Sequence, residues 1–395
     1  MLHLLDLAHK DPHRVLGLTS GTSVDGVDAA LVEIAGTGPS LRWALRAFYQ
    51  RPYSDELREE LFELFDSGRG RLADLIALEA RVGSEFAAAG AEALRRAGLA
   101  PGELDLVGSH GQTIWHAPPS VAGPERAGSW QAGCGAVLAE KLGAPVVYDF
   151  RSRDIAAGGE GAPLAPYVNY LLLADAKVGR LVLGLGGIAS LTYLPPGAGP
   201  DQVLAFHAGP ANLVIDEAVR ALTGGQMHFD AGGRMAAEGQ ISAQLIEDLL
   251  GHPFFRRPPP RSTGRDEFGS RYAVAALGKA RRMGLVPSDL VATVTALAAR
   301  IIGDAVKEFV LPRGPVDEVI ISGGGAHNAR LVELIRQQMP PRASVLLSDE
   351  FGLPCDAKEA LCVAVLANET IAGHPNNLPS ATGARHPVIL GSIAP

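Results

Sequence analysis

A glycine-rich turn near the start of the chain holds the densest group of residues suited to chemistry. It lies within LGLTSGTSVDGVDAALVEI (residues 16–34), between two apolar runs. Glycine lets the backbone approach a phosphate group without a Cβ in the way, and the Thr and Ser hydroxyls add hydrogen-bond donors. A magnesium–triphosphate also needs a carboxylate nearby, which usually acts through metal-bound water. The candidate ATP-binding residues are Gly21, Thr22, Ser23, Val24, Asp25, Gly26, Val27 and Asp28, with Asp25 as the candidate Mg²⁺ ligand through water.

The surrounding sequence limits how this turn can be interpreted. It is not a Walker A loop, because it lacks a Gly-Lys-Ser/Thr triplet and a strand pattern follows where a helix should begin. The alternative to a phosphate site is an ordinary hairpin turn, in which Asp25-Gly26 is a common pair. The turn by itself leaves both interpretations open.

Two further glycine turns occur later in the chain. GLGGIAS (184–190) mimics a dinucleotide fingerprint, but β-branched and aromatic residues and two prolines follow it, not a helix. A second hairpin turn over phosphate, through Gly186 and Gly187, fits that context better. SGGGAHN (322–328) lies between a strand and a helix pattern, where glycines let an adenine or ribose lie against the backbone. The candidate residues there are Gly323, Gly324, Gly325 and Asn328.

The elements that position these turns follow the same order in the two halves of the chain. Short turns connect three expected strands in each half, so each set should form an antiparallel meander. Helical patterns, a strand that ends in glycines, a further helix and a last strand then follow. The expected first-half elements are strands at 14–20, 27–36, 41–50, 104–113 and 144–150 and helices at 54–67, 72–98 and 131–143. Those of the second half are strands within 180–195 and at 202–209, 316–325 and 343–349 and helices at 211–225, 326–339 and 356–373. The repeated order predicts two similar α/β lobes, the alternative being one large α/β domain.

The segment HPFFRRPPPRSTGRDEFG (252–269) breaks this pattern. Its prolines forbid regular helix, and four arginines concentrate positive charge in it. We expect either a plain surface loop or a loop that lines a substrate site or a subunit contact.

Composition narrows the class of protein. The 395 residues carry a net charge of −8, which disfavours nucleic acid or an anionic membrane as the main partner. The three cysteines form no CxxC pair, so free thiols in a reducing compartment are expected. No signal peptide and no apolar run long enough to span a membrane is evident, so we expect a cytoplasmic protein.

The three glycine turns together are more specific than any one of them. Their arrangement resembles the sugar kinase, Hsp70 and actin superfamily. That resemblance implies an α/β fold of two ribonuclease-H-like lobes, each with a mixed five-stranded sheet, around an interlobe cleft. The first two turns would then hold phosphates from opposite lobes, and the third would hold adenosine. The expected first lobe is 1–150 with a C-terminal tail of about 374–395, and the second is 151–373.

A closer resemblance rests on eight motifs that occur in order over the chain beyond its first thirteen residues. They are GTSVDGVD (21–28), SHGQT (109–113), DFRSRDIAAGGEGAPL (149–164), LGGIASLT (185–192), FDAGGRMAAEG (229–239), PPPRSTGRDEF (258–268), SGGGAHN (322–328) and DAKEALCVAVLANETIAGHPNNLPSATGA (356–384). Together they resemble the anhydro-N-acetylmuramic acid kinase family.

This resemblance implies an enzyme of bacterial cell-wall recycling, with ATP and Mg²⁺ as cofactors. Such enzymes use ATP and water to open the 1,6-anhydro bond of the sugar and to phosphorylate O6. The products are N-acetylmuramic acid 6-phosphate and ADP. The resemblance also suggests a homodimer.

The chain departs from the family pattern at two places near the second turn. FHAGPAN (206–212) stands where the family commonly has FDTGPGN, so His207 and Ala208 replace an acid and a hydroxyl. Ser190 stands where Asn is common. Both departures concern the details of nucleotide or metal contact more than the reaction itself.

One carboxylate suffices for the implied reaction if the γ-phosphoryl group captures the leaving oxygen, because only the attacking water then needs a base. The family match makes Asp154 this base, with Asp149 as the rival within the same motif. The alternative for Asp149 is a strand-end acid paired with Arg151 or Arg153.

Four further residues are candidates for binding the sugar. Glu359 matches the family acid expected to bind sugar hydroxyls, although by pattern alone it is an exposed helix residue beside Lys358. His110 and Gln112 lie where a strand end can reach the sugar, with a structural role as the alternative for His110. Arg261 in the Pro-rich segment can grip the lactyl carboxylate in a bidentate fork.

Two other functions remain as alternatives. One is a kinase for another sugar or acyl acceptor, with Asp154 deprotonating a hydroxyl. The other is a non-metabolic ATPase switch, in which hydrolysis only drives lobe closure.

Overall fold

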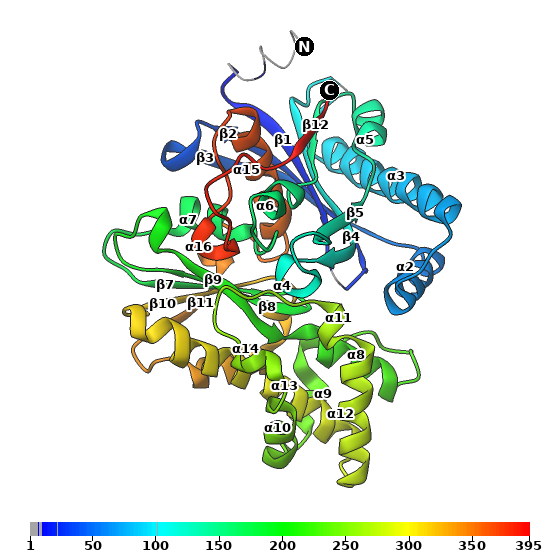
Figure 1. The fold of residues 1–395 in the computed structure, drawn as a ribbon, viewed down its shortest axis with the longest axis vertical. Coiled ribbons are helices and arrows are strands. Elements are labelled where there is room, and N and C mark those ends of the chain that lie inside the picture. Colours follow the sequence, from blue (N-terminus) through cyan, green and yellow to red (C-terminus); the bar gives the residue numbers. More distant parts are fainter. Residues whose placement is uncertain (1–6, 8–9, 22, 101) are drawn as a thin grey trace. The chain divides into compact units, whose positions relative to one another are not determined.

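The computed structural model describes residues 7, 10–21, 23–100 and 102–395, so Thr22 of the first turn lies outside the described residues. The chain divides into two compact units. Unit 1 comprises Met1–Leu172 and Asp356–Pro395, and unit 2 comprises Leu173–Cys355 (Figure 1).

Unit 1 is built on a mixed sheet of seven strands. Its strand order is β12-β6-β4-β1-β2-β3, with β5 paired to β4. β1, β2 and β3 form the expected antiparallel meander, and β4 and β6 run parallel to β1. The strands are β1 (His13–Ser20), β2 (Gly26–Ala35), β3 (Arg42–Pro52), β4 (Leu106–Ala117), β5 (Gly128–Ala132), β6 (Val146–Tyr148) and β12 (Ser392–Ala394).

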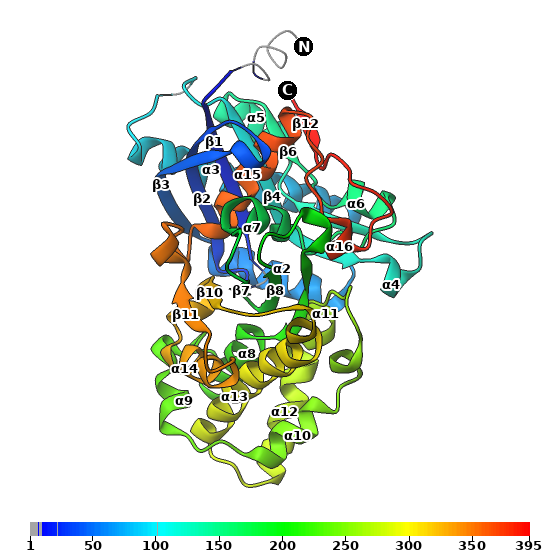
Figure 2. The same cartoon turned by 90° about the vertical axis from the view of Figure 1, so that its left-hand side faces the viewer.

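Helices cover both faces of this sheet. Neighbouring residues of a strand point to opposite sides, so Leu16 and Gly17 of β1 face different helices. A Cβ at Gly90 of α3 would lie 2.6 Å from the Leu16 side chain, whereas a Cβ at Gly17 would lie 1.9 Å from the Ala360 carbonyl of α15. Glycine at position 17 therefore lets α15 pack directly on the backbone of β1. Figure 2 shows α15 running along the strands of this sheet. The helices of unit 1 are α2 (Asp55–Ser67), α3 (Leu72–Arg96), α4 (Pro119–Ala122), α5 (Gly135–Leu142), α6 (Ser152–Ala156), α7 (Ala165–Leu173, whose last residue falls in unit 2), α15 (Lys358–Ile371) and α16 (Pro379–Thr382).

Unit 2 has a five-stranded sheet in the order β11-β10-β7-β8-β9. Helix α13 packs on β9, α8 and α14, and its apolar side chains form the centre of the unit's core. The strands are β7 (Arg180–Leu185), β8 (Ile188–Leu194), β9 (Leu204–Pro210), β10 (Glu318–Ser322) and β11 (Ser344–Leu347). The helices are α8 (Asn212–Leu222), α9 (Arg234–Glu238), α10 (Ala243–Leu250), α11 (Arg265–Phe268), α12 (Ser270–Arg282), α13 (Pro287–Ala305) and α14 (Ala329–Gln338), and one π-helical turn covers Val306–Val310.

The two sheets share one topology, which confirms the expected ribonuclease-H-like fold class. In each, an antiparallel meander is followed by two strands parallel to its first strand, β4 and β6 in unit 1 and β10 and β11 in unit 2. The sheet of unit 1 has seven strands where five were expected. β5 extends the edge beside β4, and β12 pairs antiparallel with β6.

The unit boundaries differ from the expected lobe boundaries at residue 150 and near residue 373. Residues 151–172 and 356–373 lie in unit 1 because their contacts are there. α15 packs against β1, β2 and β4. Tyr167 of α7 donates a 2.8 Å hydrogen bond to Glu369 of α15.

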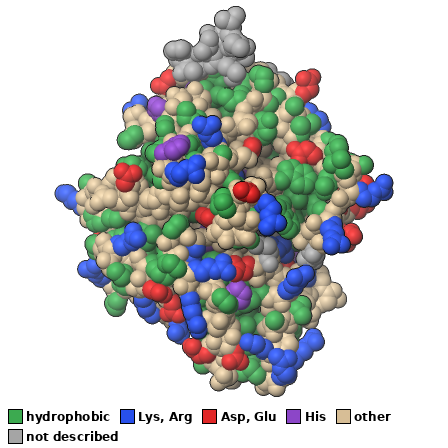
Figure 3. Space-filling model, in the orientation of Figure 1, with side chains coloured by type: hydrophobic (Ala, Val, Ile, Leu, Met, Phe, Trp, Pro, Cys, Tyr) green, Lys and Arg blue, Asp and Glu red, His purple; other side chains and the backbone are tan. Residues whose placement is uncertain are grey.

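The surface is charged in a mixed pattern. Acidic and basic side chains are interspersed over most of the face in Figure 3. None of the described helices combines the length and the apolar character that a membrane crossing requires.

Candidate functional site

The first glycine turn connects β1 to β2 at one edge of the unit 1 sheet. The carboxyl ends of parallel strands meet at the same edge, so the segments that follow β1 and β6 and the distal part of β4 lie near one another. Ser20 at the end of β1 is in register with Gln112 of β4, and Ser109 of β4 with Tyr148 of β6. The topology thus brings the turn, His110 and Asp149 to one edge.

The turn has an unusual backbone at Val24. Its φ is 57°, in the left-handed region that β-branched residues rarely adopt. Its side chain is fully buried, as is that of Val27, so the side chains of these two candidates belong to the core. Asp25 is exposed, and one of its carboxylate oxygens accepts a 2.8 Å hydrogen bond from the Ser23 hydroxyl. A Cβ at Gly21 would have only Ser23 atoms within 4 Å, at 3.5 Å or more.

Four carboxylates surround this turn. Burial is the main cause that raises the pKa of Asp28 to about 7, and the charges of Asp25, Glu359 and Asp356 raise it further. A 3.0 Å hydrogen bond from the Gln50 amide opposes that shift. These four carboxylates do not form a preformed metal site. Among the described residues no group of three His, Cys, Asp or Glu side chains could hold a metal ion.

Glu359 lies in the first turn of α15, with its side chain exposed to solvent. Protein atoms around the carboxylate displace water and raise its pKa, and the charge of Asp25 acts in the same direction. Lys358 and Arg151 oppose the shift. An accessible carboxylate with a raised pKa has the properties of a general base.

Asp154 has different surroundings. Its side chain, on α6, has no exposed surface. Oδ1 accepts 2.7 Å hydrogen bonds from the Asn377 amide and from the Thr382 hydroxyl, and Oδ2 accepts a 2.8 Å bond from the Gly161 N–H. These contacts fix the carboxylate and tie the C-terminal segment to α6.

Asp149, the rival carboxylate, follows β6 with a φ of 54°. Its Oδ1 accepts hydrogen bonds from the N–H and the hydroxyl of Ser152, at 3.3 and 2.7 Å. Among the described residues it forms no ion pair with Arg151 or Arg153, which was the expected alternative. The half-buried side chain instead caps the start of α6.

Arg151 and His110 are both titratable, and the charge of Arg151 affects the pKa of His110. Arg151 donates a 2.8 Å hydrogen bond to the Gly161 carbonyl, and burial lowers its pKa to about 10. Burial, with the Arg151 charge as the second cause, lowers the pKa of His110 to about 3. The His110 ring is therefore neutral at physiological pH, with Nδ1 3.1 Å from the Gly111 carbonyl oxygen.

Gln112 is buried beneath the first turn. Its Oε1 accepts a 2.7 Å hydrogen bond from the Ser20 hydroxyl, and its Nε2 donates to the Gly21 carbonyl at 3.3 Å. The expected contact of Gln112 with a sugar stays a prediction, because these bonds all lie within the protein. They make Gln112 a brace of the turn.

The second and third glycine turns lie together in unit 2. The carbonyls of Gly186 and Gly187 accept hydrogen bonds from the first N–H groups of α8, including that of Asn212 at 3.1 Å. A Cβ at Gly325 would lie 2.6 Å from Leu185, the residue directly before the second turn. Asn212 also donates to the Leu185 carbonyl at 3.2 Å, which holds the start of α8 against the second turn.

The members of the third turn differ in role. Gly323 has a φ of 83°, and a Cβ there would lie 3.0 Å from the Leu185 carbonyl, so glycine is needed. A Cβ at Gly324 would meet only the Asn212 amide, at 3.8 Å, so this position is open. Asn328 is the N-cap of α14, where its Oδ1 accepts a 2.9 Å hydrogen bond from the Leu331 N–H.

Arg261, expected to grip a substrate carboxylate, directs its guanidinium to groups of the protein itself. All its guanidinium nitrogens donate to backbone carbonyls, and its planar head lies near three phenylalanine rings. The acceptors are the carbonyls of His207, Ala208, Phe254, Phe255 and Arg257, and the rings are those of Phe206, Phe254 and Phe309. Its side chain is buried, which lowers its pKa to about 10. Arg261 therefore organises the Pro-rich loop.

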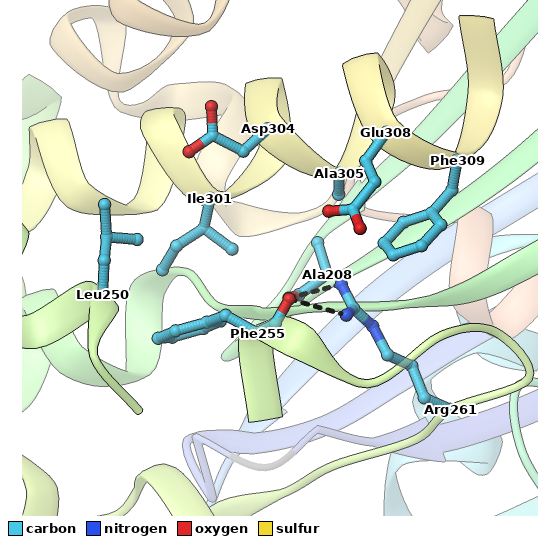
Figure 4. Close-up of a pocket in the computed structure, with 9 residues that line it drawn as sticks. All are labelled: Ala208, Leu250, Phe255, Arg261, Ile301, Asp304, Ala305, Glu308 and Phe309. Carbon is cyan, nitrogen blue, oxygen red and sulfur yellow. Dashed lines mark hydrogen bonds between the residues drawn. The ribbon is translucent and has the colours of Figure 1, made fainter. Parts of the chain in front are cut away.

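Figure 4 shows Arg261 at one side of a cavity of about 160 Å³, opposite Glu308 and Phe309 of the π-helical turn. The cavity lies wholly within unit 2. The first departure from the family pattern is close by. The N–H of Thr263 lies 3.1 Å from Nδ1 of His207, so this histidine binds the Pro-rich loop. The second departure, Ser190, has its hydroxyl 3.5 Å from the Gly184 carbonyl.

Sequence reasoning missed the residues that hold the candidates in place. Asn377 and Thr382 lie in the last family motif, but no pattern links them to Asp154. Arg151 was considered only as a partner of Asp149. Its Nε–H is buried without a hydrogen-bond partner among the described residues.

Comparison with known proteins assigns the chain to a family. The family model described as anhydro-N-acetylmuramic acid kinase matches residues 13–395. The kinase of that name from Caldanaerobacter subterraneus subsp. tengcongensis is 42% identical over 396 residues, covering 100% of both chains. That from Salinibacter ruber is 44% identical, covering 99% of this chain and 98% of the relative. That from Gloeobacter violaceus is 44% identical, covering 98% and 99%. This chain belongs to the anhydro-N-acetylmuramic acid kinase family, a family of ATP-using phosphotransferases.

Proposed function

We propose that this chain uses ATP and water to open the 1,6-anhydro bond of anhydro-N-acetylmuramic acid and to phosphorylate O6. The products are N-acetylmuramic acid 6-phosphate and ADP. The observation that carries the proposal is the placement of Glu359, Asp25 and Asp28 around one glycine turn in unit 1. That arrangement would place backbone N–H groups that can bind phosphate beside a carboxylate that can activate water, at one edge of a sheet.

The reaction needs a group that takes a proton from the attacking water. Water oxygen bonds to C1, the C1–O6 bond breaks, and O6 bonds to the γ-phosphorus as ADP leaves. Asp154 is the base that the resemblance implies. Its side chain is buried, however, and its oxygens already accept three hydrogen bonds from the protein. Glu359 is accessible and has a raised pKa. We assign proton acceptance to Glu359 and a positioning role to Asp154.

The glycine turns would bind ATP. The backbone of Gly21–Asp25 would meet phosphate in unit 1, as would Gly186 and Gly187 in unit 2. The third turn, Gly323–Gly325, would meet adenosine. Asn328 would support this turn by capping the start of α14. The carboxylates of Asp25 and Asp28 would hold Mg²⁺ through water, and that ion would offset phosphate charge when bound.

His110 fits a neutral partner for the sugar. An imidazole that stays uncharged can donate to or accept from a hydroxyl without competing for the phosphate. We further propose that the chain acts in the cytoplasm as a homodimer, in the recycling of cell-wall sugars.

The test is incubation with ATP, Mg²⁺ and anhydro-N-acetylmuramic acid, read by mass spectrometry. The proposal expects a sugar product that has gained both water and a phosphoryl group. A kinase for another sugar would phosphorylate N-acetylglucosamine-type acceptors without needing an anhydro bond. An ATPase switch would yield ADP and phosphate with no phosphorylated sugar.

A further inference from the structure

The carbonyl groups of the first glycine turn accept hydrogen bonds from donors inside and outside the turn, the inside donor being the Val24 N–H at 3.3 Å from the Gly21 carbonyl. The Gly21 carbonyl accepts from Gln112 at 3.3 Å, and the Gly26 carbonyl accepts from the Ser20 hydroxyl at 2.6 Å. Between them, the Asp25 carbonyl accepts from the N–H of Tyr53 at 3.0 Å. The carbonyl oxygens of the turn are thus directed into the protein.

The Val24 carbonyl is held by a side chain from a distant helix. Nε of Arg58 donates to it at 3.1 Å, although the two residues are 34 positions apart. Val24 is also the residue with the unfavourable φ of 57°. Its buried side chain lies in the same core cluster as Leu57 and Leu61 of α2. Helix α2 therefore holds the backbone of Val24 through Arg58, and it contributes to the core in which the Val24 side chain is buried.

The direction of the Val24 carbonyl sets the direction of the next amide. In a planar trans peptide the C=O of one residue and the N–H of the following residue point opposite ways. Because Arg58 draws the Val24 carbonyl inward, the N–H of Asp25 points away from Arg58. A left-handed residue within such a turn is the geometry in which successive N–H groups form an anion-binding nest.

Arg58 is well placed to hold this peptide rigidly. It lies in the first turn of α2, whose N-cap Ser54 accepts a 3.3 Å hydrogen bond from Leu57. Its side chain is only 19% exposed, and Asp55 lies 4.0 Å from its Nη1. Tyr53, the donor to Asp25, directly precedes this N-cap, so one segment fixes two neighbouring carbonyls.

We propose that Arg58 is a positioning residue for phosphate binding, which keeps the Val24–Asp25 peptide turned so that its N–H meets the triphosphate. This inference rests on the proposed function of the first turn. Arg58 itself contacts no substrate in this account. It acts through the backbone of Val24.

The test compares Arg58→Met, which keeps the aliphatic stem and loses the donor, with Arg58→Lys, which keeps a charged donor. Calorimetry with a non-hydrolysable ATP analogue and Mg²⁺ should give a Kd about tenfold higher for Arg58→Met, the scale of one charge-assisted hydrogen bond. Arg58→Lys should recover most of the affinity. The KM for the sugar should stay within twofold of the wild-type value.

A matched control separates this role from general support of α2. Arg81→Met removes an exposed arginine that pairs with Glu60 of α2 at 2.9 Å and should leave the Kd for ATP unchanged. If Arg58→Met does not fold, Arg58→Gln replaces it as the variant without the long donor.

An ATP affinity within twofold of wild type in the variant that lacks the donor would overturn the inference. So would equal increases in the KM for both substrates, which indicate a merely structural role. Failure of the wild-type protein to bind ATP would instead contradict the proposed function.

Discussion

The carboxylate of Asp154 accepts a 2.7 Å hydrogen bond from the side-chain amide of Asn377, across 223 residues of sequence. With the Thr382 hydroxyl at 2.7 Å and the Gly161 N–H at 2.8 Å, it holds the C-terminal segment against α6. A buried carboxylate used in this way stabilises a structure, and its removal leaves donors without acceptors.

Asp154→Asn should therefore lower the free energy of unfolding by about 2–4 kcal/mol, because an amide cannot accept all three hydrogen bonds. Thermal or denaturant unfolding measures this change. Asp149→Asn is the matched control, because an amide oxygen can still cap Ser152. An Asp154→Asn variant of wild-type stability without turnover would restore Asp154 as the base.

Glu359→Gln should lower kcat by about 10²–10⁴, the usual contribution of a general base. Its affinity for ATP should hardly change, because the glycine turns carry that binding. Steady-state kinetics and calorimetry give the two values. The acidic limb of the wild-type rate profile should be absent from the residual activity of the variant. Near-normal turnover of Glu359→Gln would show that the wrong carboxylate has been assigned.

Gly21→Val should abolish measurable ATP binding while the protein stays folded. The space around Gly21 accepts a Cβ, since only Ser23 atoms lie within 4 Å. A branched side chain there would occupy the position of the phosphate. Nucleotide titration of a variant with a wild-type melting curve decides the matter. Unchanged ATP affinity would make the turn an ordinary hairpin.

Asp28 should make stability fall as pH rises. Its pKa is about 7 in the folded state against an ordinary value of 3.8, so the folded state holds a proton that the unfolded state releases. Stability is lost progressively between pH 4 and pH 7, and the loss is complete above pH 7. Asp28→Asn should accordingly be more stable than wild type at pH 8, by about 4 kcal/mol, the free energy that corresponds to a pKa raised from 3.8 to about 7. That advantage should vanish near pH 4, and a pH-independent difference would contradict the raised pKa.

Arg261→Met should destabilise unit 2 by about 3 kcal/mol or more, because buried backbone carbonyls lose their donors. The KM for the sugar should change little in the protein that remains folded. A higher KM for the sugar with an unchanged melting temperature would restore Arg261 as the residue that binds the lactyl carboxylate.

Sequence patterns predicted the sheets well where strands are apolar and turns are short. β1 and β2 are examples, because both are buried apolar runs and the glycine turn lies between them. β5 overlaps the start of the helix expected at 131–143, since four of its five residues are half-buried and carry little periodicity. β12 has three residues and depends on pairing with β6.

The candidate site was predictable only in part. The glycine turns stand out in local sequence, whereas only the family resemblance singles out Glu359, which by pattern alone is an exposed helix residue. The role of Arg261 depends on five carbonyls from two separate segments, and that of Arg58 on a carbonyl 34 residues away. Such convergence comes from tertiary packing, which local residue types do not encode.

The most direct test of the proposed reaction is to run it in ¹⁸O-labelled water and analyse the sugar phosphate by mass spectrometry. The proposed reaction places one ¹⁸O atom at C1 of the product and none in its phosphoryl group, with one ADP formed per sugar. A phosphorylated sugar without ¹⁸O, with its anhydro bond intact, or ¹⁸O in inorganic phosphate without a phosphorylated sugar, would contradict it.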